Sequence, residues 1–555
     1  MSSPKSHTPA PPPEPPDRSA QPVKPSPPAG LSSIEINPGF RRALDIMEGT
    51  DRHVFITGKA GTGKSTLLEH FRSQTPKRIA VLAPTGVAAL NVRGQTIHSF
   101  FKFKPDITPD RVRKVARPRG SESIYKNLDA VVIDEVSMVR ADLMDCVERF
   151  LRLNGPHPRK LFGGLQMILI GDLYQLPPVV TGLEKALFAR DGSGRYGSPY
   201  FFSAAVFAEP AFDLEFVELE KVYRQTDAGF IDLLNAIRNR SIDDAQVDHL
   251  NSRCRPDFSP PDGKFYITLT STNDLAAMRN REKLAALPGR ARRYEGIIDG
   301  DFDRSSLPTE EALELKPGAQ VMLLTNDRHG RWVNGTIGRV DKIVKVAGAD
   351  DIIAVDIPGE GPVQVLPNIW ELFHFRYDAE SDQIESEAVG AFTQYPLRLA
   401  WAVTIHKSQG KTFDRVVIDI GRGAFAHGQV YVALSRCTSF EGIVLKRPIT
   451  KNHIWMDWRI VRFLTRFQYE KAEAAVPAAD RRAMVLEAIR AGHELEIIYL
   501  KPDDTKSRRR IRPEAVEMME YHGRTFEGVR AFCHKRGEVR HFRIDRMLEI
   551  RQVES

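Results

Sequence analysis

The chain has 555 residues, of which 42% are hydrophobic, and its formal net charge is +7 at pH 7. A single hydrophobic core seldom grows beyond about 250–300 residues, so we expect several domains. No apolar run is long enough to span a bilayer, and no charged start with an apolar core follows Met1, which argues against a membrane protein and against a secreted one. The mild positive charge permits a nucleic-acid partner but does not establish one.

The first 32 residues form a Pro-, Ser- and Ala-rich tail without apolar periodicity, which predicts disorder. Docking to a proline-binding module is the alternative for this tail. From about residue 33 short apolar runs alternate with helical stretches. These runs are residues 78–83, 130–133, 166–170, 264–269 and 415–420. Such alternation predicts an α/β fold of βα units, with parallel sheets and helices on both faces.

The composition of the globular part, and its pattern of strand-like and helical stretches, predict its division into domains. We expect a first α/β domain over residues 33–211 and a second over residues 212–450, which begins at the strand 216–219. A β-rich and turn-rich stretch predicts a small β-barrel inserted in the second domain, over about 315–392. An Ala-, Glu- and Arg-rich stretch predicts a helical linker over 451–481, and a last small β-barrel follows over 482–555.

Residues 58–66 fit the pattern G-x-x-x-x-G-K-[ST], in which backbone N–H groups cradle the phosphates of a nucleoside triphosphate. An apolar run (53–57) precedes this P-loop and a helical stretch (67–71) follows it, as the motif requires. We expect Lys64 to reach the β- and γ-phosphates, and the Ser65 hydroxyl to hold Mg²⁺. The predicted cradle consists of Gly58, Gly61, Thr62, Gly63, Lys64, Ser65 and Thr66. An ordinary Gly-rich turn is the alternative, and the flanking elements argue against it.

Two carboxylates follow the strand 130–133, and a glutamine lies soon after the strand 166–170. Asp134 falls at the carboxyl edge of the predicted sheet, where it can hold Mg²⁺. Glu135 can orient or deprotonate the attacking water. Gln175 can sense a γ-phosphate or position water, because an amide both donates and accepts. A solvated acidic pair and a proline-stiffened turn are the alternatives, and the P-loop upstream favours hydrolysis.

Two arginines complete the predicted hydrolytic site. Arg224 follows the strand 216–219, and Arg436 closes the run 431–436. A guanidinium from a facing domain stabilises charge on the transferring phosphoryl group and couples hydrolysis to closure. Taken singly, both arginines would be interpreted as surface residues.

Several blocks occur in a fixed order between residues 36 and 450. They are APTGVAA at 83–89, GQTIHSF at 94–100, IDEVSM at 133–138, FGGLQ at 162–166, WVNGT at 332–336, TIHKSQGKTF at 404–413 and YVALSR at 431–436. In this order they resemble the Pif-one family of superfamily 1 DNA helicases, a RecD-like group. The ending YVALSR distinguishes the chain from RecD proper, which usually has a Thr-Arg pair there.

The resemblance implies a two-lobed motor that binds ATP between two RecA-like domains, while single-stranded DNA crosses both. It implies a helicase that moves 5′ to 3′ and unwinds duplex, acting as a monomer on single-stranded and forked DNA. The implied DNA contacts are Thr85, His98, Thr404, His406 and Lys407. Hydroxyls, cations and rings suit a sequence-blind motor that holds phosphates and stacks bases. Taken alone, the two histidines would more often be packed or capping residues.

The segment 100–121 is strongly basic. Its charged residues are Lys102, Lys104, Arg111, Arg113, Lys114, Arg117 and Arg119, against Asp106 and Asp110, and Phe101 and Phe103 are interleaved. This composition predicts equally well a small wedge that splits the duplex and a solvated basic loop.

One departure from the resembled family concerns base recognition. Its members usually carry a glutamine that reads adenine, in a Leu-Ser-x-x-Gln-like stretch upstream of the P-loop. The matching residues 35–40 here are EINPGF, without a glutamine. Either Asn37 substitutes with a shorter amide, or nucleotide selectivity is relaxed. ATP remains the expected nucleotide.

Residues 485–553 resemble a WYL domain, a small β-barrel often attached to bacterial regulators. The resemblance rests on AIRAG at 488–492, IIY at 497–499, RRIRP at 509–513 and RHFRIDR at 540–546. The Trp-Tyr-Leu triplet that names these domains is absent, and TFE stands at 525–527, about where it should fall. Such domains are thought to bind nucleic acid or nucleotide-like ligands through arginines, here Arg509, Arg540 and Arg546. Solvated arginines are the alternative. WYL domains often occur in bacterial regulators, and the scattered cysteines suit a reducing compartment. Together these features predict a cytoplasmic, nucleoid-associated bacterial protein.

Together these features predict an ATP-dependent DNA helicase that uses ATP and Mg²⁺. The main alternative is a DNA-binding NTPase switch that the WYL-like domain controls, without processive unwinding. The basic segment and the complete block at 404–413 favour translocation, because a switch does not need a DNA-coupled second lobe. The block GDLYQLPPV at 171–179, which contains Gln175, and the block YVALSR at 431–436 are not those of protein-remodelling AAA+ ATPases, and they exclude that class.

Overall fold

The computed structural model describes residues 35–553 except 116–122, 181, 183, 189–193, 262, 328, 379, 422–425, 502–505 and 522–523. The chain divides into two compact units, Met1–Glu35 and Ile36–Ser555, and the description below concerns the second. The predicted disordered tail, 1–32, lies outside the described residues, as do Arg117 and Arg119 of the basic segment.

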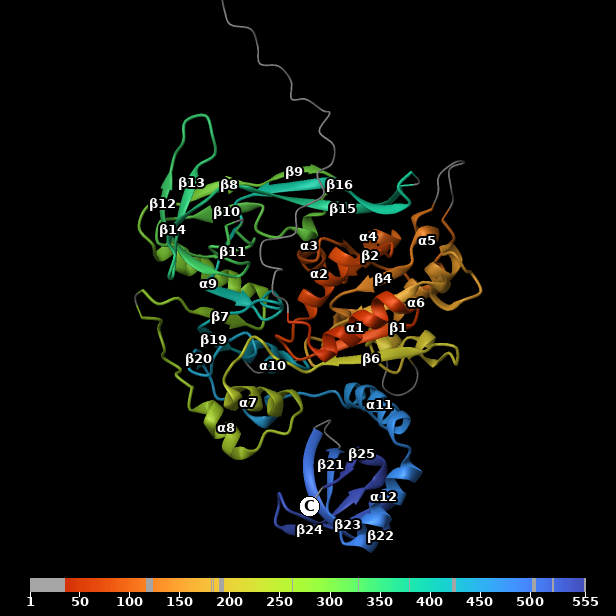
Figure 1. Cartoon of the computed structure of the whole chain (residues 1–555). Helices are drawn as coiled ribbons and strands as arrows, with labels where there is room; N and C mark the ends of the chain where they lie inside the picture. The colour runs from red at the N-terminus through yellow and green to blue at the C-terminus, as the bar shows by residue number, and fades with distance from the viewer. Residues whose placement is uncertain are drawn as a thin grey trace, which may run out of the picture. The chain divides into compact units, whose positions relative to one another are not determined.

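The first lobe is built on a six-stranded parallel sheet with the order β3-β2-β4-β5-β1-β6. Figure 1 labels β2, β4, β1 and β6 of this sheet. Its strands are β1 (His53–Gly58), β2 (Ile79–Ala83), β3 (Gln95–Thr96), β4 (Ala130–Ile133), β5 (Gln166–Ile170) and β6 (Leu214–Leu219). Every residue of β4 and β5 is buried. Continuous burial is expected of central parallel strands, whose two faces are both covered.

The first lobe has six α-helices among the described residues, and three of them begin at a short polar side chain that caps them. The six helices are α1 (Pro38–Gly49), α2 (Lys64–Gln74), α3 (Gly86–Asn91), α4 (Ile97–Phe101), α5 (Ile124–Asn127) and α6 (Ala141–Asn154). Asn37 caps α1, because its Oδ1 accepts from the backbone N–H of Phe40 at 2.9 Å. Thr85 caps α3 and Thr96 caps α4 in the same manner. Each cap satisfies a backbone donor that the helix itself leaves unpaired.

Strand β6 corrects the predicted boundary between the two α/β domains. It pairs in parallel with β1, from Leu214 opposite His53 to Leu219 opposite Gly58. It is therefore the edge strand of the first sheet, and the second lobe does not begin at residue 212. The sequence could not reveal this, because an apolar strand carries no mark of the sheet that it joins.

The second lobe contains a four-stranded parallel sheet with the order β18-β7-β19-β20. These strands are β7 (Ile267–Thr270), β18 (Ala402–Thr404), β19 (Val416–Asp419) and β20 (Ile443–Leu445). The helices of this lobe are α7 (Ala228–Arg238), α8 (Asp244–Asn251), α9 (Asn273–Ala286) and α10 (Gln429–Leu434). Two parallel sheets with helices agree with the α/β fold that the sequence predicted.

Antiparallel strands interrupt the second lobe over a longer stretch than the predicted 315–392. They are β8 (Arg292–Glu295), β9 (Ile297–Gly300), β10 (Ala312–Leu315), β11 (Gln320–Leu323), β12 (Ile337–Val344), β13 (Ile352–Ile357), β14 (Gly361–Val365), β15 (Asn368–Asp378), β16 (Gln383–Gln394) and β17 (Leu397–Leu399). Five of them pair in the open order β14-β13-β12-β11-β17 around an apolar core of their own. Closure into a barrel stays a prediction.

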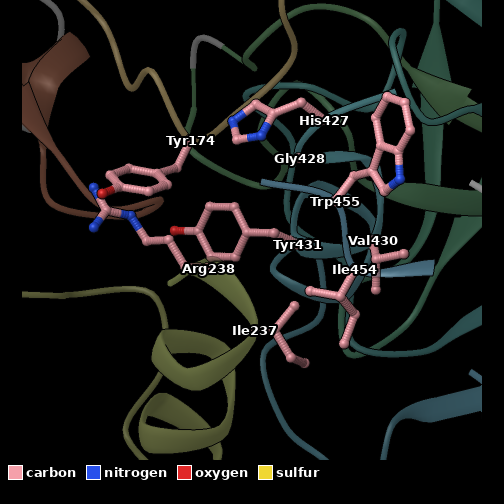
Figure 2. Close-up of a pocket in the computed structure, with 9 residues that line it drawn as sticks. All are labelled: Tyr174, Ile237, Arg238, His427, Gly428, Val430, Tyr431, Ile454 and Trp455. Carbon is pink, nitrogen blue, oxygen red and sulfur yellow. The ribbon is translucent and has the colours of Figure 1, made fainter. Parts of the chain in front are cut away.

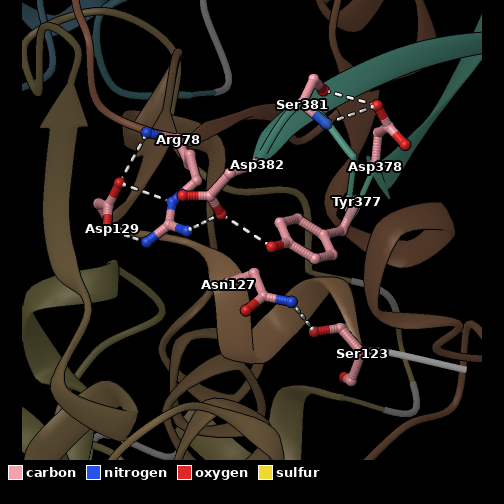
Figure 3. Close-up of polar contacts among 8 residues, drawn as sticks. All are labelled: Arg78, Ser123, Asn127, Asp129, Tyr377, Asp378, Ser381 and Asp382. Atoms are coloured by element: carbon pink, nitrogen blue, oxygen red, sulfur yellow. Dashed lines mark hydrogen bonds and ion pairs between the residues drawn. The ribbon is translucent and has the colours of Figure 1, made fainter.

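The long hairpin β15–β16 reaches the first lobe (Figure 3). Nη1 of Arg78, just before β2, lies 2.7 Å from Oδ1 of Asp382, which also accepts from the Tyr377 hydroxyl at 2.8 Å. Arg78 is held in turn by Asp129, just before β4, at 3.0 Å. Phe375 packs edge-on against Phe100. Polar and aromatic contacts thus join the insert to the first lobe.

The C-terminal domain is a five-stranded antiparallel sheet with the order β24-β23-β22-β21-β25, and α12 (Ala478–Ala491) packs on it. Its strands are β21 (Leu495–Leu500), β22 (Lys506–Tyr521), β23 (Arg524–Cys533), β24 (Glu538–Arg543) and β25 (Met547–Gln552). The preceding helix α11 (Trp458–Ala475) is more than the predicted linker, because Phe463 stacks on Phe202 and Phe467 stacks on Phe216 of the first lobe.

Candidate active site

The P-loop joins β1 to α2 at the carboxyl edge of the first sheet. Gly61 and Gly63 have φ angles of +81° and +85°, which side-chain-bearing residues adopt only with strain. A Cβ on Gly58 would lie 2.5 Å from Oγ1 of Thr62 and 2.7 Å from the carbonyl oxygen of Leu219. The three glycines therefore determine the conformation of this loop. The start of α2 that follows is a ready anion site, because its first backbone N–H groups lack partners within the helix.

Lys64 lies in the first turn of α2 and folds back over the loop. Its Nζ donates to the carbonyl oxygens of Gly58 at 2.7 Å and Lys59 at 3.0 Å. Removal from water lowers the pKa of Lys64, and the charges of Asp172 and Glu135 oppose that shift. An incompletely solvated ammonium group in this position is suited to bind phosphate.

Asp134 and Glu135 follow β4 directly, at the same sheet edge as the P-loop. Asp134 is buried, and its backbone N–H donates to Leu82 at 2.9 Å. Glu135 has a φ of +50°, and its Oε2 accepts a hydrogen bond from Nε2 of Gln409, in the second lobe, at 3.0 Å. Burial raises the pKa of both carboxyl groups, and the charge of Asp134 raises the pKa of Glu135 further. Two crowded carboxyl groups favour the arrival of a cation.

The donors present fit Mg²⁺. Asp134 offers a buried carboxylate and Ser65 an exposed hydroxyl, both hard oxygen donors. In the part of the chain that the structure describes, no group of three or more His, Cys, Asp or Glu side chains could hold a metal ion. That sparse set is typical of Mg²⁺, which binds through one or two protein ligands together with substrate phosphates and water.

Gln175 is fixed by a buried carboxylate that the sequence analysis missed. Its Nε2 donates to Oδ2 of Asp172 at 3.3 Å, and Nη2 of Arg238, at the end of α7, donates to Oδ1 of Asp172 at 3.3 Å. The side chains of Asp172 and Arg238 are 0% and 5% exposed. The Arg238 guanidinium also lies over the ring of Tyr174, 3.8 Å from its centroid. Asp172 could have been found as a carboxylate after a strand, whereas no local pattern marks Arg238.

The two predicted arginines lie together where the lobes meet. Arg224 donates to the carbonyl oxygens of Ser435 at 3.2 Å and Gly410 at 3.3 Å. Arg436 is 1% exposed and donates through Nε to Val432 at 3.0 Å. Burial lowers the pKa of both, and the charge of Arg224 lowers the pKa of Arg436 further. A buried guanidinium group beside a half-buried one favours an anion such as a γ-phosphate. Because β6 belongs to the first sheet, Arg224 comes from the joining segment rather than from a facing domain.

Tyr431 gives the P-loop a direct partner in the second lobe. Its hydroxyl accepts a hydrogen bond from the backbone N–H of Ala60 at 3.0 Å, and both residues are buried. The sequence analysis noted the run 431–436 but gave the tyrosine no role. The site therefore combines groups from both lobes around one loop.

The region expected to read the nucleotide base holds no free amide. Nδ2 of Asn37 donates to the hydroxyl of Tyr223 at 3.0 Å, while its Oδ1 caps α1. Phe40 is buried, and its ring would lie 3.0 Å from a Cβ on Gly63. Asn37 thus makes two hydrogen bonds within the chain, and the choice between substitution for a glutamine and relaxed selectivity stays a prediction.

The predicted DNA contacts differ in accessibility. Thr85 and Lys407 are exposed, and His98 and His406 are half-buried with pKa values that burial lowers. Thr404 is 3% exposed, and its Oγ1 accepts from the backbone N–H of Lys407 at 3.2 Å. Thr404 therefore stabilises the turn that presents Lys407 and is not itself placed to meet DNA.

The aromatic part of the predicted wedge is wrong. Phe101 is 1% exposed and Phe103 is 9% exposed, and both pack against Phe150 of α6. They belong to the core of the first lobe, because an aromatic ring that is surrounded by apolar side chains is stabilised there by burial. The described basic side chains between Phe101 and Val115 are exposed. Exposure fits a wedge and a solvated loop equally, so the choice between them stays a prediction.

The three C-terminal arginines occupy different surroundings. Arg509 on β22 is 8% exposed, and its Nη1 is buried without a hydrogen-bond partner among the described residues. Arg540 on β24 is exposed and pairs with Glu538 at 3.6 Å. Arg546 is half-buried, and its charge acts on Tyr469 of α11 and on Tyr499 of β21.

Among the described residues, no helix is both long enough and apolar enough to cross a membrane. The fold and the site define a P-loop nucleotide-binding protein with two RecA-like α/β lobes. Comparison with known families agrees: the PIF1-like helicase profile matches residues 40–248, and the WYL domain profile matches residues 482–552.

Individual relatives extend the match beyond the first lobe. Human ATP-dependent DNA helicase PIF1 is 36% identical over 405 residues, which cover 70% of this chain and 57% of the human protein. ATP-dependent DNA helicase Pif1 of Bdellovibrio bacteriovorus is 32% identical over 451 residues, which cover 79% of this chain and 93% of that protein. This chain thus spans little more than half of the human relative.

Solved structures agree with these relatives. Bacteroides Pif1 in complex with ADP-AlF4 superposes with a TM-score of 0.68 at 34% identity, covering 79% of this chain and 98% of that one. Bacteroides Pif1 bound to ssDNA gives a TM-score of 0.54 at 34% identity, covering 78% and 96%. The chain belongs to the PIF1-like helicase family and carries a WYL domain at its C-terminal end. Both resemblances inferred from the sequence are confirmed.

Proposed function

We propose that this chain is an ATP-dependent DNA helicase, which translocates 5′ to 3′ on single-stranded DNA and unwinds the duplex ahead. The observation that carries the proposal is the contact of the second lobe with the P-loop, where Tyr431 meets Ala60 at 3.0 Å. Arg224, beside the P-loop, likewise donates to Ser435 and Gly410 of the second lobe. Because the groups that face the phosphates also join the lobes, a change at the nucleotide changes the fit between the lobes. DNA held by both lobes then moves.

In this proposal each residue of the site has one task. Lys64 holds the β- and γ-phosphates, Glu135 takes a proton from the attacking water, and Gln175 orients that water. Arg224 and Arg436 stabilise the charge that develops on the transferring phosphoryl group. Ser65 and Asp134 would hold Mg²⁺, which would supply positive charge against the charge of the phosphates.

The proposed DNA path uses Thr85 and His98 on the first lobe, and His406 and Lys407 on the second. Two ring side chains suit base stacking, and Lys407 suits a phosphate. For the C-terminal domain we propose a nucleic-acid or nucleotide-like ligand. The buried, unpartnered Nη1 of Arg509 supports this, because a buried guanidinium without a partner is costly unless a ligand supplies one. The ssDNA complex of the Bacteroides protein supports single-stranded DNA as a partner. Action as a monomer on forked DNA stays a prediction.

The decisive experiment measures ATP hydrolysis with and without single-stranded DNA, and unwinding of duplexes that carry either a 5′ or a 3′ tail. Glu135→Gln is the control, because it keeps the shape of the site and removes the base. We expect DNA to stimulate hydrolysis, and unwinding only of the 5′-tailed duplex. Hydrolysis indifferent to DNA would overturn the motor, whereas stimulated hydrolysis without unwinding would identify a switch.

A further inference from the structure

His427 lies two residues before α10 and contacts two separate segments of the chain. Its Nε2 lies 3.1 Å from the carbonyl oxygen of Leu173, in the loop that carries Gln175. Its Nδ1 lies 3.1 Å from the backbone N–H of Asp457, the residue that caps α11. The ring is 5% exposed and faces Tyr174, as Figure 2 shows. No motif drew attention to this histidine in the sequence.

The two hydrogen bonds determine the protonation state of the ring. A backbone N–H can only donate, so Nδ1 must accept from Asp457 and carries no proton. Nε2 then carries the proton and donates to Leu173. The ring also faces the backbone of Trp455. Donation to Trp455 as well as to Leu173 would need a proton on both ring nitrogens, and burial, which lowers the pKa of His427, disfavours that charged form. The amide at the start of α11 therefore selects the tautomer that holds the Gln175 loop.

Gly428 shows how closely this segment approaches the Gln175 loop. A Cβ on Gly428 would lie 2.4 Å from the carbonyl oxygen of Gln175 and 2.5 Å from that of Tyr174. The backbone at 427–428 thus touches the loop backbone directly, and the His427 hydrogen bond lies next to this contact. Because Gln175 acts through its side chain, a loop that slides along this contact would misplace its amide.

The other partner, α11, is anchored at both ends. At its start, Arg459 donates to the carbonyl oxygen of Gly197 at 2.9 Å, and further along Phe463 stacks on Phe202. Near its end Glu473 pairs with Arg481 of α12, which belongs with the C-terminal domain. The backbone N–H of Asp457, from which His427 accepts, therefore stands at the start of a helix, α11, that is held in place at both ends.

We propose that His427 is a positioning residue for ATP hydrolysis, which holds the Gln175 loop through Leu173 in a tautomer selected by Asp457, the residue that caps α11. This inference rests on the proposed function, since it names the group that places Gln175 for the same reaction. It also gives α11, and the domain attached to it, a route to the hydrolytic centre through one imidazole ring.

The two amide variants of His427 separate its two hydrogen bonds. Glutamine places an N–H donor near the position of Nε2, and asparagine places an oxygen acceptor near the position of Nδ1. In the full-length protein we would compare His427→Gln, His427→Asn and His427→Ala. The first readout is kcat and KM for ATP at saturating single-stranded DNA. The second is hydrogen exchange at the backbone amide of Asp457, which reports the start of α11.

We expect His427→Ala and His427→Asn to lower kcat about tenfold or more, with KM for ATP nearly unchanged, because a misplaced catalytic group slows the chemistry without weakening phosphate binding. His427→Gln should restore kcat to within about threefold. Exchange at Asp457 should stay slow in His427→Asn and become fast in His427→Gln and His427→Ala. This crossed pattern cannot come from general loss of stability.

Three results would overturn the inference: wild-type kcat in all three variants, equal loss of kcat in all three, or better rescue by asparagine than by glutamine. Failure of the proposed function is read separately, from the wild-type protein. If single-stranded DNA does not stimulate wild-type hydrolysis, the motor is refuted, and the same comparison on basal hydrolysis still tests His427.

Discussion

Replacing Gly428 with alanine tests how far the hydrolytic centre depends on contact between the lobes. Gly428 has a φ of +74°, so alanine there is strained by about 1 kcal/mol or more. The larger effect is steric, because the added Cβ would lie 2.4 Å from the carbonyl oxygen of Gln175. Real contacts of this kind stay beyond 3.0 Å, so the two backbones must separate by at least about 0.6 Å. A misplacement of about 1 Å can cost about 100-fold in rate, and we expect kcat to fall about 10- to 100-fold.

The assay is steady-state ATP turnover at saturating single-stranded DNA, with thermal unfolding measured on the same samples. Gly289→Ala is the matched control, because Gly289 also lies in the second lobe with a φ of +80° but has no atom within 4 Å of the added Cβ. It carries the backbone strain without the clash, so its kcat should stay within about twofold of wild type. Equal kcat in the two variants would refute the reasoning, as would a loss in Gly428→Ala that tracks its melting temperature alone.

Three further changes probe other parts of the structure. Phe101→Ala should lower the free energy of unfolding by about 3–5 kcal/mol, because its ring fills the core, and denaturant titration should detect this before any specific loss of unwinding. Tyr431→Phe leaves the buried N–H of Ala60 unpaired, which should weaken the contact between lobes by about 1–3 kcal/mol and lengthen the inter-lobe distance measured by fluorescence energy transfer. Burial lowers the pKa of His53 to about 4 from 6.5, so the folded chain binds this proton less tightly than the unfolded chain. The contribution of neutral His53 to the free energy of unfolding is complete above pH 6.5 and is lost as the pH falls towards 4, by about 2 kcal/mol at pH 5. His53→Asn keeps an acceptor for the backbone N–H of Met167 and should remove that part of the pH dependence in denaturant titrations.

Local patterns predicted the parts of the site that are themselves local. The P-loop and the Asp134-Glu135 pair depend on a few consecutive residues and the strands before them, so sequence order places them correctly. Arg238 depends instead on the approach of α7 to the loop after β5, 66 residues earlier in the chain. No spacing rule connects two such positions.

The errors share one physical origin. Phe101 and Phe103 stand between basic residues, and that sequence does not reveal whether a ring turns towards solvent or towards Phe150 of α6. The sequence of strand β6 fits an edge strand of either sheet equally well, and only its pairing with β1 shows that it belongs to the first. In each case long-range packing determines the outcome, and local sequence leaves it open.

The aromatic contacts of α11 bear on how the chain is made. Phe202 and Phe216 are translated long before Phe463 and Phe467, which stack on them. Since a chain emerges from the ribosome with its N-terminal part first, the first lobe leaves synthesis with an uncovered aromatic face. This aromatic face stays uncovered until the whole second lobe and then α11 have been synthesised. A chaperone that shields apolar surface would bind the nascent chain at this aromatic face. A product terminated near residue 450 would keep the face exposed permanently and would be prone to aggregate.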